Sequence, residues 1–141
     1  MVVQIGAIHL VLGSAGGQGE VYLVERDGQF FIAKIFSLMT DEVFNLFKHI
    51  QSIQAPNVPK IYDLYNHNDK TVLIREYIDG HTLYDEMKTE KMLSFNKAKY
   101  LILKICETLE SFHNIEPNPI IYRDLKPENI MISNDGQVYL I

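Results

Sequence analysis

The first third of the chain alternates runs of β-branched and aromatic residues with turn residues. The stretch EVYLVERDGQFFIAKIF predicts two strands, at residues 20–25 and 29–36, with Asp27-Gly28 as the hairpin turn between them. Two later runs, KIYDLY and KTVLIREYI, predict a second hairpin whose polar turn covers residues 66–69. We therefore expect antiparallel strand pairs in this part of the chain.

A helical period of apolar residues separates the two predicted hairpins. In TDEVFNLFKHIQSI the apolar side chains recur every three or four positions, at Val43, Leu46, Phe47, Ile50 and Ile53. Thr40 or Asp41 is expected to cap the start of this helix, and prolines follow its end. The pattern predicts one amphipathic helix between the strand pairs.

A longer helix is predicted at residues 94–113, with Ser94 as its N-cap. One apolar stripe consists of Ala98, Leu101, Ile102, Ile105, Leu109 and Phe112. Leu103 and Cys106 extend this stripe toward a second face, so we expect the helix to be covered from more than one side, with a partner recruited to any face left exposed. The closing segment predicts a loop, a short strand, a turn at residues 134–136 and a further strand.

Composition narrows the class of protein. With 141 residues, 47% of them hydrophobic, the chain can bury a core. A net charge of -5 and the lack of any Lys/Arg block argue against a nucleic-acid or membrane-surface partner. The single cysteine, Cys106, cannot form an internal disulfide and is expected to be a small buried residue of a protein in a reducing compartment. Residues 2–12 are apolar but too short to span a bilayer and lack a signal-peptide pattern, so we expect a cytoplasmic protein.

The segment YRDLKPENIMI, residues 122–132, concentrates the candidate chemistry. Asp124 and Asn129 stand five positions apart, Lys126 lies between them, and Pro127 stiffens the loop. Transfer of a phosphoryl group to a hydroxyl needs a carboxylate to take the proton, a cation for the phosphate and an oxygen ligand for a metal ion. This short loop provides all three. The histidines show no metal-ligand spacing, so no metal site built on histidine is expected.

Two further segments are suited to binding phosphates. The glycines of LGSAGGQGEVY, residues 12–22, allow backbone N–H groups to approach phosphate oxygens between two strands. In FIAKIF, Lys34 lies in an otherwise apolar strand and needs an anionic partner, because burial of an unpaired ammonium group is costly.

These motifs resemble those of the protein kinase family, in their order and spacing. YRDLKPEN is similar to the family's H-R-D-L-x-x-x-N, with Tyr122 in place of histidine. The resemblance implies that Asp124 is the catalytic base, that Lys126 contacts the transferring phosphate and that Asn129 holds a magnesium ion. A lysine two positions after the aspartate resembles the serine/threonine branch of the family.

The glycine segment resembles the family's G-x-G-x-x-G-x-V loop. Gly16 and Gly19 fall in register, Ser14 takes the first glycine position, and Gly13 fits there only with a one-residue insertion. The resemblance implies that the loop covers the phosphates of ATP, with an aliphatic residue on each face of the adenine. The expected contributors are Leu12, Gly13, Ser14, Gly16, Gly17, Gly19 and Val21.

FIAKIF resembles the family's V-A-I-K strand, which implies that Lys34 reaches the α- and β-phosphates. Leu46 occupies the position of the helix glutamate that usually pairs with this lysine. Glu42, one turn earlier, is either the replacement partner of Lys34 or a first-turn acid that complements the helix dipole.

The segment LIREYIDGHTL resembles the hinge between the two lobes of a kinase. It implies that the backbone groups of Glu76 and Ile78 bind the adenine edge, and it places Arg75 at the position that gates the pocket behind the adenine. The role of Arg75 is open.

The resemblance implies an α+β, protein kinase-like fold. Residues 1–79 are expected to form the nucleotide-binding small lobe, an antiparallel sheet plus one helix with the hinge at its end. Residues 80–141 are expected to form the beginning of the helical large lobe, ending after the catalytic-loop hairpin.

The implied activity is that of a serine/threonine protein kinase, of bacterial type, that uses ATP and Mg²⁺ to phosphorylate a protein substrate. In kinases a strand like VYLI leads into D-F-G, whose aspartate is a second magnesium ligand, whereas this sequence stops at Ile141. We therefore expect a fragment, and its own activity is open. The alternatives are a truncated pseudokinase that binds nucleotide or a partner, and a small-molecule phosphotransferase of kinase-like fold.

Overall fold

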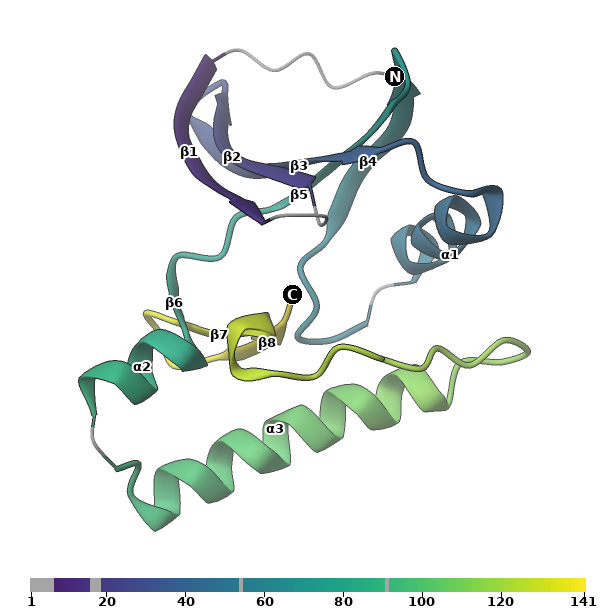
Figure 1. Ribbon diagram of the computed structural model, residues 1–141. Coiled ribbons are helices and arrows are strands. Elements are labelled where there is room, and N and C mark those ends of the chain that lie inside the picture. Colours follow the sequence, from purple (N-terminus) through teal and green to yellow (C-terminus); the bar gives the residue numbers. More distant parts are fainter. Residues whose placement is uncertain (1–6, 16–18, 54, 91) are drawn as a thin grey trace. The chain divides into compact units, whose positions relative to one another are not determined.

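An antiparallel sheet of five strands, in the order β1-β2-β3-β5-β4, forms the N-terminal part of the computed structural model (Figure 1). The structure describes residues 7–15, 19–53, 55–90 and 92–141, and side chains from residue 19 onward. The strands are β1 (Ala7–Ala15), β2 (Gly19–Arg26), β3 (Gln29–Ser37), β4 (Ile61–His67) and β5 (Lys70–Glu76). The sheet belongs to the first of two compact units, which consists of residues 1–54 and 60–77.

Both predicted hairpins are confirmed. The turn between β2 and β3 holds Asp27 at φ 52° and Gly28 at φ 79°, and the turn between β4 and β5 holds Asn68 at φ 45° and Asp69 at φ 55°. Two consecutive left-handed residues are favoured in tight hairpins because their twist matches that of the strands, and Asn, Asp and Gly tolerate this conformation best.

The helix α1 (Asp41–Ser52) lies beside β4 in the same unit (Figure 1). Thr40 is its N-cap, and the Thr40 hydroxyl accepts a hydrogen bond from the Val43 N–H at 3.5 Å. The helix packs Phe44, Phe47 and Ile50 against a cluster formed by Ile61, Leu64 and Leu73. Because side chains alternate along a strand, the second cluster lies on the opposite face of the sheet; it comprises Val24, Phe31, Ala33, Val72 and Ile74.

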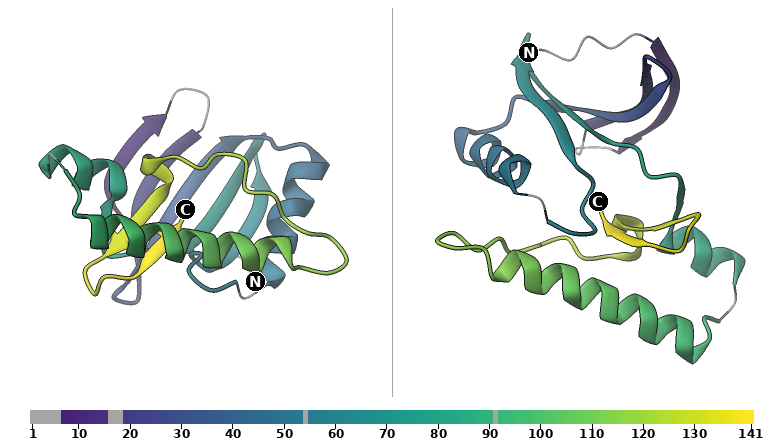
Figure 2. Two further views of the ribbon diagram at one scale, coloured as in Figure 1. Left: turned by 90° about the horizontal axis from the view of Figure 1, so that it is seen from below. Right: turned by 180° about the vertical axis from the view of Figure 1, so that it is seen from behind.

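The second unit consists of residues 55–59 and 78–141. It contains a three-stranded antiparallel sheet in the order β6-β7-β8. Its elements are β6 (Gly80–Thr82), α2 (Leu83–Thr89), α3 (Phe95–His113), the short 3₁₀ helix η1 (Pro127–Asn129), β7 (Ile130–Ser133) and β8 (Val138–Leu140). Figure 2 shows α3 running along this small sheet. The shared core consists of Leu83, Leu101, Ile130, Ile132, Val138 and Leu140.

The short elements β6 and α2 were not predicted. A strand of three residues is too short for its hydrophobic period to be recognised in the sequence. The strand nevertheless requires glycine at Gly80, where a Cβ would lie 2.1 Å from the Ile132 carbonyl oxygen. The helix α2 begins with a capping box, in which the Thr82 hydroxyl accepts from the Asp85 N–H and the Asp85 carboxylate accepts from the Thr82 N–H.

The long helix α3 begins after Ser94, as predicted, and the Ser94 hydroxyl accepts from the Lys97 N–H at 3.3 Å. Its second apolar face is exposed, with Leu103 at 51% of its full accessibility, and Ile102 of the predicted stripe is also exposed, at 60%. The prediction of a buried Cys106 was wrong, since its side chain lies on this exposed face. None of the helices in the described ranges is both long and apolar enough to cross a bilayer.

Candidate active site

The loop that leads into β7 is fixed by backbone and hydroxyl hydrogen bonds. The Tyr122 hydroxyl donates to the Ile141 carbonyl at 3.0 Å, and the Ile141 N–H donates to the Asn129 carbonyl at 3.0 Å. Within the loop, the Asn129 N–H donates to the Lys126 carbonyl at 2.9 Å and closes the turn of η1. Both ends of the segment are therefore held by neighbouring backbone, and Pro127 stiffens the turn between them.

This fixed loop brings together the three predicted catalytic residues. The Asp124 Oδ2 lies 2.9 Å from the Lys126 Nζ and accepts a hydrogen bond from the Asn129 Nδ2 at 2.8 Å. The same Asn129 nitrogen donates to the Asp124 backbone carbonyl at 2.9 Å. The hydrogen bond from Lys126 holds the pKa of Asp124 below its usual value, and the bond from Asn129 acts in the same direction. The carboxylate is therefore ionised at neutral pH and half-exposed to solvent, as a proton acceptor must be.

The geometry of Asn129 suits a magnesium ligand. Its amide nitrogen makes both bonds to Asp124, so the carbonyl oxygen Oδ1 points to the other side of the amide plane. Among the hydrogen bonds of the described residues, none uses this oxygen. Magnesium prefers oxygen ligands, so the residue fits the role.

The described residues of the glycine segment lie in β1 and β2, which pair antiparallel. In their register Gly13 is opposite Val21, Ser14 is opposite Glu20 and Ala15 is opposite Gly19. Gly19 has a φ of +90°, and a Cβ there would lie 2.3 Å from the Ile35 carbonyl oxygen, so only glycine fits. Leu12 lies in β1, whereas Gly16 and Gly17 fall outside the described residues.

Lys34 lies in β3, opposite Val21 of β2 and Leu73 of β5. Ile32 is opposite Arg75, so Lys34 and Arg75 are diagonal neighbours on one face of the sheet. Burial lowers the pKa of Lys34 to about 8, and the positive charge of Arg75 contributes to this shift. A buried cation of this kind fits the phosphates of a nucleotide.

No ion pair of the described residues joins Lys34 to a carboxylate. Glu42 is exposed in the first turn of α1, beside Asp41, where an acid complements the helix dipole. The structure therefore does not bring Glu42 to Lys34, and their pairing stays a prediction.

The two predicted hinge residues lie at the end of β5 and just beyond it. The Glu76 N–H donates to the Lys60 carbonyl at 2.8 Å, and the Glu76 carboxylate accepts from the Lys60 N–H at 3.0 Å. These two bonds tie the end of β5 to the residue before β4. Ile78 is the first residue of the second unit after this strand, and its side chain is buried.

Residues 8–141 match the family described as the protein kinase domain. The chain belongs to the protein kinase family. It is 34% identical over 130 residues to mitogen-activated protein kinase kinase 2 of Arabidopsis thaliana, which covers 87% of this chain and 35% of that protein. It is 31% identical over 137 residues to the cAMP-dependent protein kinase catalytic subunit of Dictyostelium discoideum, covering 91% of this chain and 20% of that protein.

A bacterial relative is also similar. A probable serine/threonine-protein kinase of Clostridium perfringens is 31% identical over 102 residues, which covers 70% of this chain and 14% of that protein. The chain therefore spans about a third or less of the length of these curated relatives. The kinase-like α+β fold that the motifs implied is thus confirmed by both the family and the architecture.

Sequence reasoning missed two features of this site. The Tyr122 hydroxyl anchors the loop before β7 to Ile141, a contact that no motif indicates. The ion pair between Lys126 and Asp124 was also not predicted, although the two residues stand only two positions apart in a turn. A charge pattern of this kind could have suggested it.

Proposed function

We propose that this chain is the nucleotide-binding and catalytic-loop part of a serine/threonine protein kinase. The observation that carries the proposal is the Asp124 carboxylate, ionised and held by Lys126 and Asn129 in one fixed loop. Membership of the protein kinase family and similarity to serine/threonine kinases support it.

The reaction transfers the γ-phosphoryl group of ATP to a protein hydroxyl. The hydroxyl oxygen forms a bond to the γ-phosphorus while the bond from that phosphorus to the β–γ bridging oxygen breaks, and ADP leaves. Asp124 orients the hydroxyl and takes its proton. Lys126, which lies next to Asp124, neutralises charge on the oxygens of the phosphoryl group during its transfer.

Asn129 is the proposed magnesium ligand, through its Oδ1. A bound Mg²⁺ would neutralise charge on the phosphates. The two hydrogen bonds from the Asn129 nitrogen fix the amide plane, so the oxygen that would face the metal is set before any ligand arrives.

The first unit supplies the proposed ATP contacts. Its β1–β2 hairpin contributes backbone N–H groups, and Lys34 contributes the cation for the α- and β-phosphates. The proposed nucleotide-binding residues are Leu12, Gly13, Ser14, Gly16, Gly17, Gly19, Val21 and Lys34, together with the backbone of Glu76 and Ile78.

A second candidate is a pseudokinase that binds nucleotide or a partner without turnover. It is favoured by one observation, namely that Lys34 has no carboxylate ion partner among the described residues. In a pseudokinase, the exposed apolar side chains of α3, Ile102 and Leu103, would bind a partner protein. In an active kinase, a further segment of the protein could cover the same side chains.

The deciding experiment measures phosphoryl transfer by the whole natural protein that carries this sequence. Labelled ATP is offered with Mg²⁺ and one of three acceptors: a generic protein substrate, an aminoglycoside or a sugar. We expect label on serine or threonine of the protein substrate alone. Label on the small acceptors would indicate a small-molecule phosphotransferase, and nucleotide binding without any transfer would indicate a pseudokinase.

A further inference from the structure

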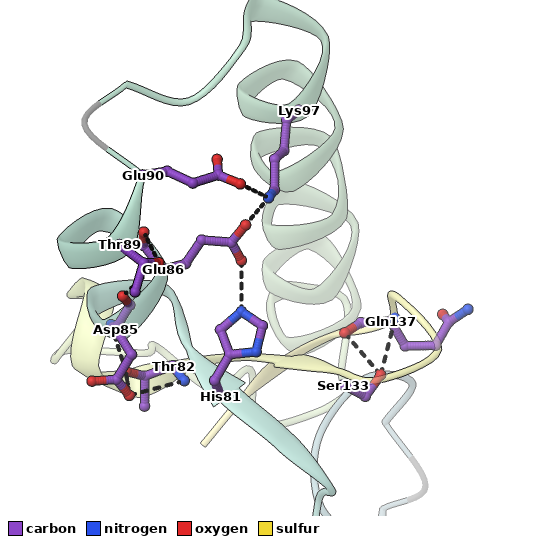
Figure 3. Close-up of polar contacts among 9 residues, drawn as sticks. All are labelled: His81, Thr82, Asp85, Glu86, Thr89, Glu90, Lys97, Ser133 and Gln137. Atoms are coloured by element: carbon purple, nitrogen blue, oxygen red, sulfur yellow. Dashed lines mark hydrogen bonds and ion pairs between the residues drawn. The ribbon is translucent and has the colours of Figure 1, made fainter.

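Glu86 of α2 is a buried carboxylate outside the catalytic loop, with a relative exposure of 6%. Each of its oxygens faces a basic side chain, as Figure 3 shows. Oε1 forms an ion pair with the Lys97 ammonium, and Oε2 lies 2.7 Å from the His81 Nε2. A buried carboxylate is costly unless it is paired and hydrogen-bonded, and here both oxygens are satisfied.

The three residues of this network come from three different elements. His81 lies in β6, opposite Ile132 of β7, and Lys97 lies in the first turn of α3. Lys97 also contacts Glu90, the C-cap of α2, at 3.2 Å. The network therefore ties α2 to the strand on one side and to the long helix on the other.

The position of α2 bears directly on the catalytic loop, because α2 packs against η1 and β7. Leu83 of α2 belongs to the same buried cluster as Ile130, which follows directly on η1. The last residue of η1 is Asn129, whose amide fixes the Asp124 carboxylate. A shift of α2 would therefore move the turn that holds both catalytic side chains.

We propose that Glu86 is a positioning residue for phosphoryl transfer, whose buried pairing with Lys97 and His81 holds α2 against η1 and so keeps Asn129 and Asp124 aligned. The proposal rests on the proposed kinase function. It goes beyond that function, because Glu86 and Lys97 lie outside the motifs of the site and His81, within the hinge-like segment, was assigned no role there.

A purely structural role of Glu86 would involve the same contacts, so the test must distinguish a structural role from a positioning role. In Glu86→Leu an apolar side chain of similar size replaces the buried charge, and the side chains of Lys97 and His81, with exposed fractions of 35% and 46%, can turn to solvent once their partner is gone. Glu86→Gln keeps the shape and removes the charge, and it serves as a second variant if Glu86→Leu folds poorly. Glu90→Gln is the matched control, because Glu90 contacts the same Lys97 but is half-exposed.

The experiment uses the whole natural protein and two readouts. Hydrogen exchange is measured at the Asn129 N–H, which closes η1, and at the Leu140 N–H, which donates to the Asn57 carbonyl at 3.0 Å in the same unit. Steady-state kinetics give kcat and the KM for ATP. We expect both Glu86 variants to exchange the Asn129 amide about 10-fold faster with Leu140 unchanged. We expect kcat to fall roughly 10-fold or more with the KM for ATP within about 2-fold, because small misplacements of catalytic groups are costly.

Unchanged hydrogen exchange at Asn129 would show that Glu86 does not hold the turn of η1. Equal acceleration at Asn129 and Leu140 would show that Glu86 has a general structural role. Either result would overturn the positioning role. A stable Glu86 variant with the kcat of the unmodified protein would overturn it as well. Failure of the kinase proposal is a separate result, because it appears as absence of transfer by the unmodified protein.

Discussion

Asn129 donates two hydrogen bonds from one amide nitrogen to Asp124, at 2.8 Å to the carboxylate Oδ2 and at 2.9 Å to the backbone carbonyl. The pair fixes the direction of the carboxylate and leaves the opposite side of the amide, its oxygen, for a metal ion. One residue thus links the alignment of the proposed base to the proposed metal site.

The substitution Asn129→Ala removes both functions at once. We expect kcat to fall by roughly 100-fold, because the base loses its orienting bonds and the metal loses a ligand. The concentration of free Mg²⁺ that gives half-maximal activity should rise in parallel. The check is a titration of kcat with Mg²⁺ at saturating ATP; an unchanged magnesium requirement would show that Asn129 is not a metal ligand.

Lys34 should destabilise the fold below pH 8 while it serves nucleotide binding. Its pKa is lowered from 10.5 to about 8 in the folded protein, so between these values the unfolded chain binds a proton that the folded chain does not. Stability therefore rises as the pH rises through this window, and the cost of the buried charge is fully present below it.

Lys34→Met should accordingly increase the free energy of unfolding by roughly 3 kcal/mol at pH 7, since the pKa of Lys34 is lowered from 10.5 to about 8 and one pKa unit corresponds to about 1.4 kcal/mol. The gain should shrink toward pH 10, and the loss of ATP affinity should be largest below pH 8, where Lys34 is charged. Urea unfolding of both proteins at pH 7 and pH 9.5 measures this difference. A gain that is the same at both pH values would contradict the assigned pKa.

Gly19 should tolerate no side chain. Alanine there would adopt a φ of +90° and place its Cβ 2.3 Å from the Ile35 carbonyl oxygen. We expect Gly19→Ala to reduce the free energy of unfolding by about 2 kcal/mol or more, through strain plus displacement of β3. The matched control is Gly28→Ala, which shares a positive φ of +79° but meets no atom within 4 Å and should cost only about 1 kcal/mol. Equal losses for the two variants in urea unfolding would rule out the steric argument.

Local chemistry explains why much of the fold was predictable. Asp27-Gly28 specifies its turn through residues that adopt positive φ, and Ser94 specifies the start of α3 through a side-chain cap. The loop with Asp124 and Asn129 was recognisable because spacing within a short loop determines which side chains can meet. These features depend on neighbours in sequence.

The remaining features depend on contacts distant in sequence. The apolar pattern of α3 marks two faces, but only the packing of β8 and its neighbours decides which one is buried, and so Cys106 was misplaced. The polar sequence around Glu86 is typical of a surface segment. The burial of its carboxylate depends on Lys97 and His81, which lie in other elements. The environment of Lys34 likewise includes Arg75, which lies on a different strand.

The most direct test of the central claim is the rate of protein phosphorylation by Asp124→Asn. The side chain is half-exposed, and asparagine preserves its size, so the fold and nucleotide affinity should be unchanged. We predict that kcat falls by roughly 1,000-fold or more in the whole natural protein while the Kd for ATP stays within about 2-fold, because the proton acceptor is lost. Phosphoryl transfer at the unmodified rate by Asp124→Asn would contradict the assignment of Asp124 as the catalytic base.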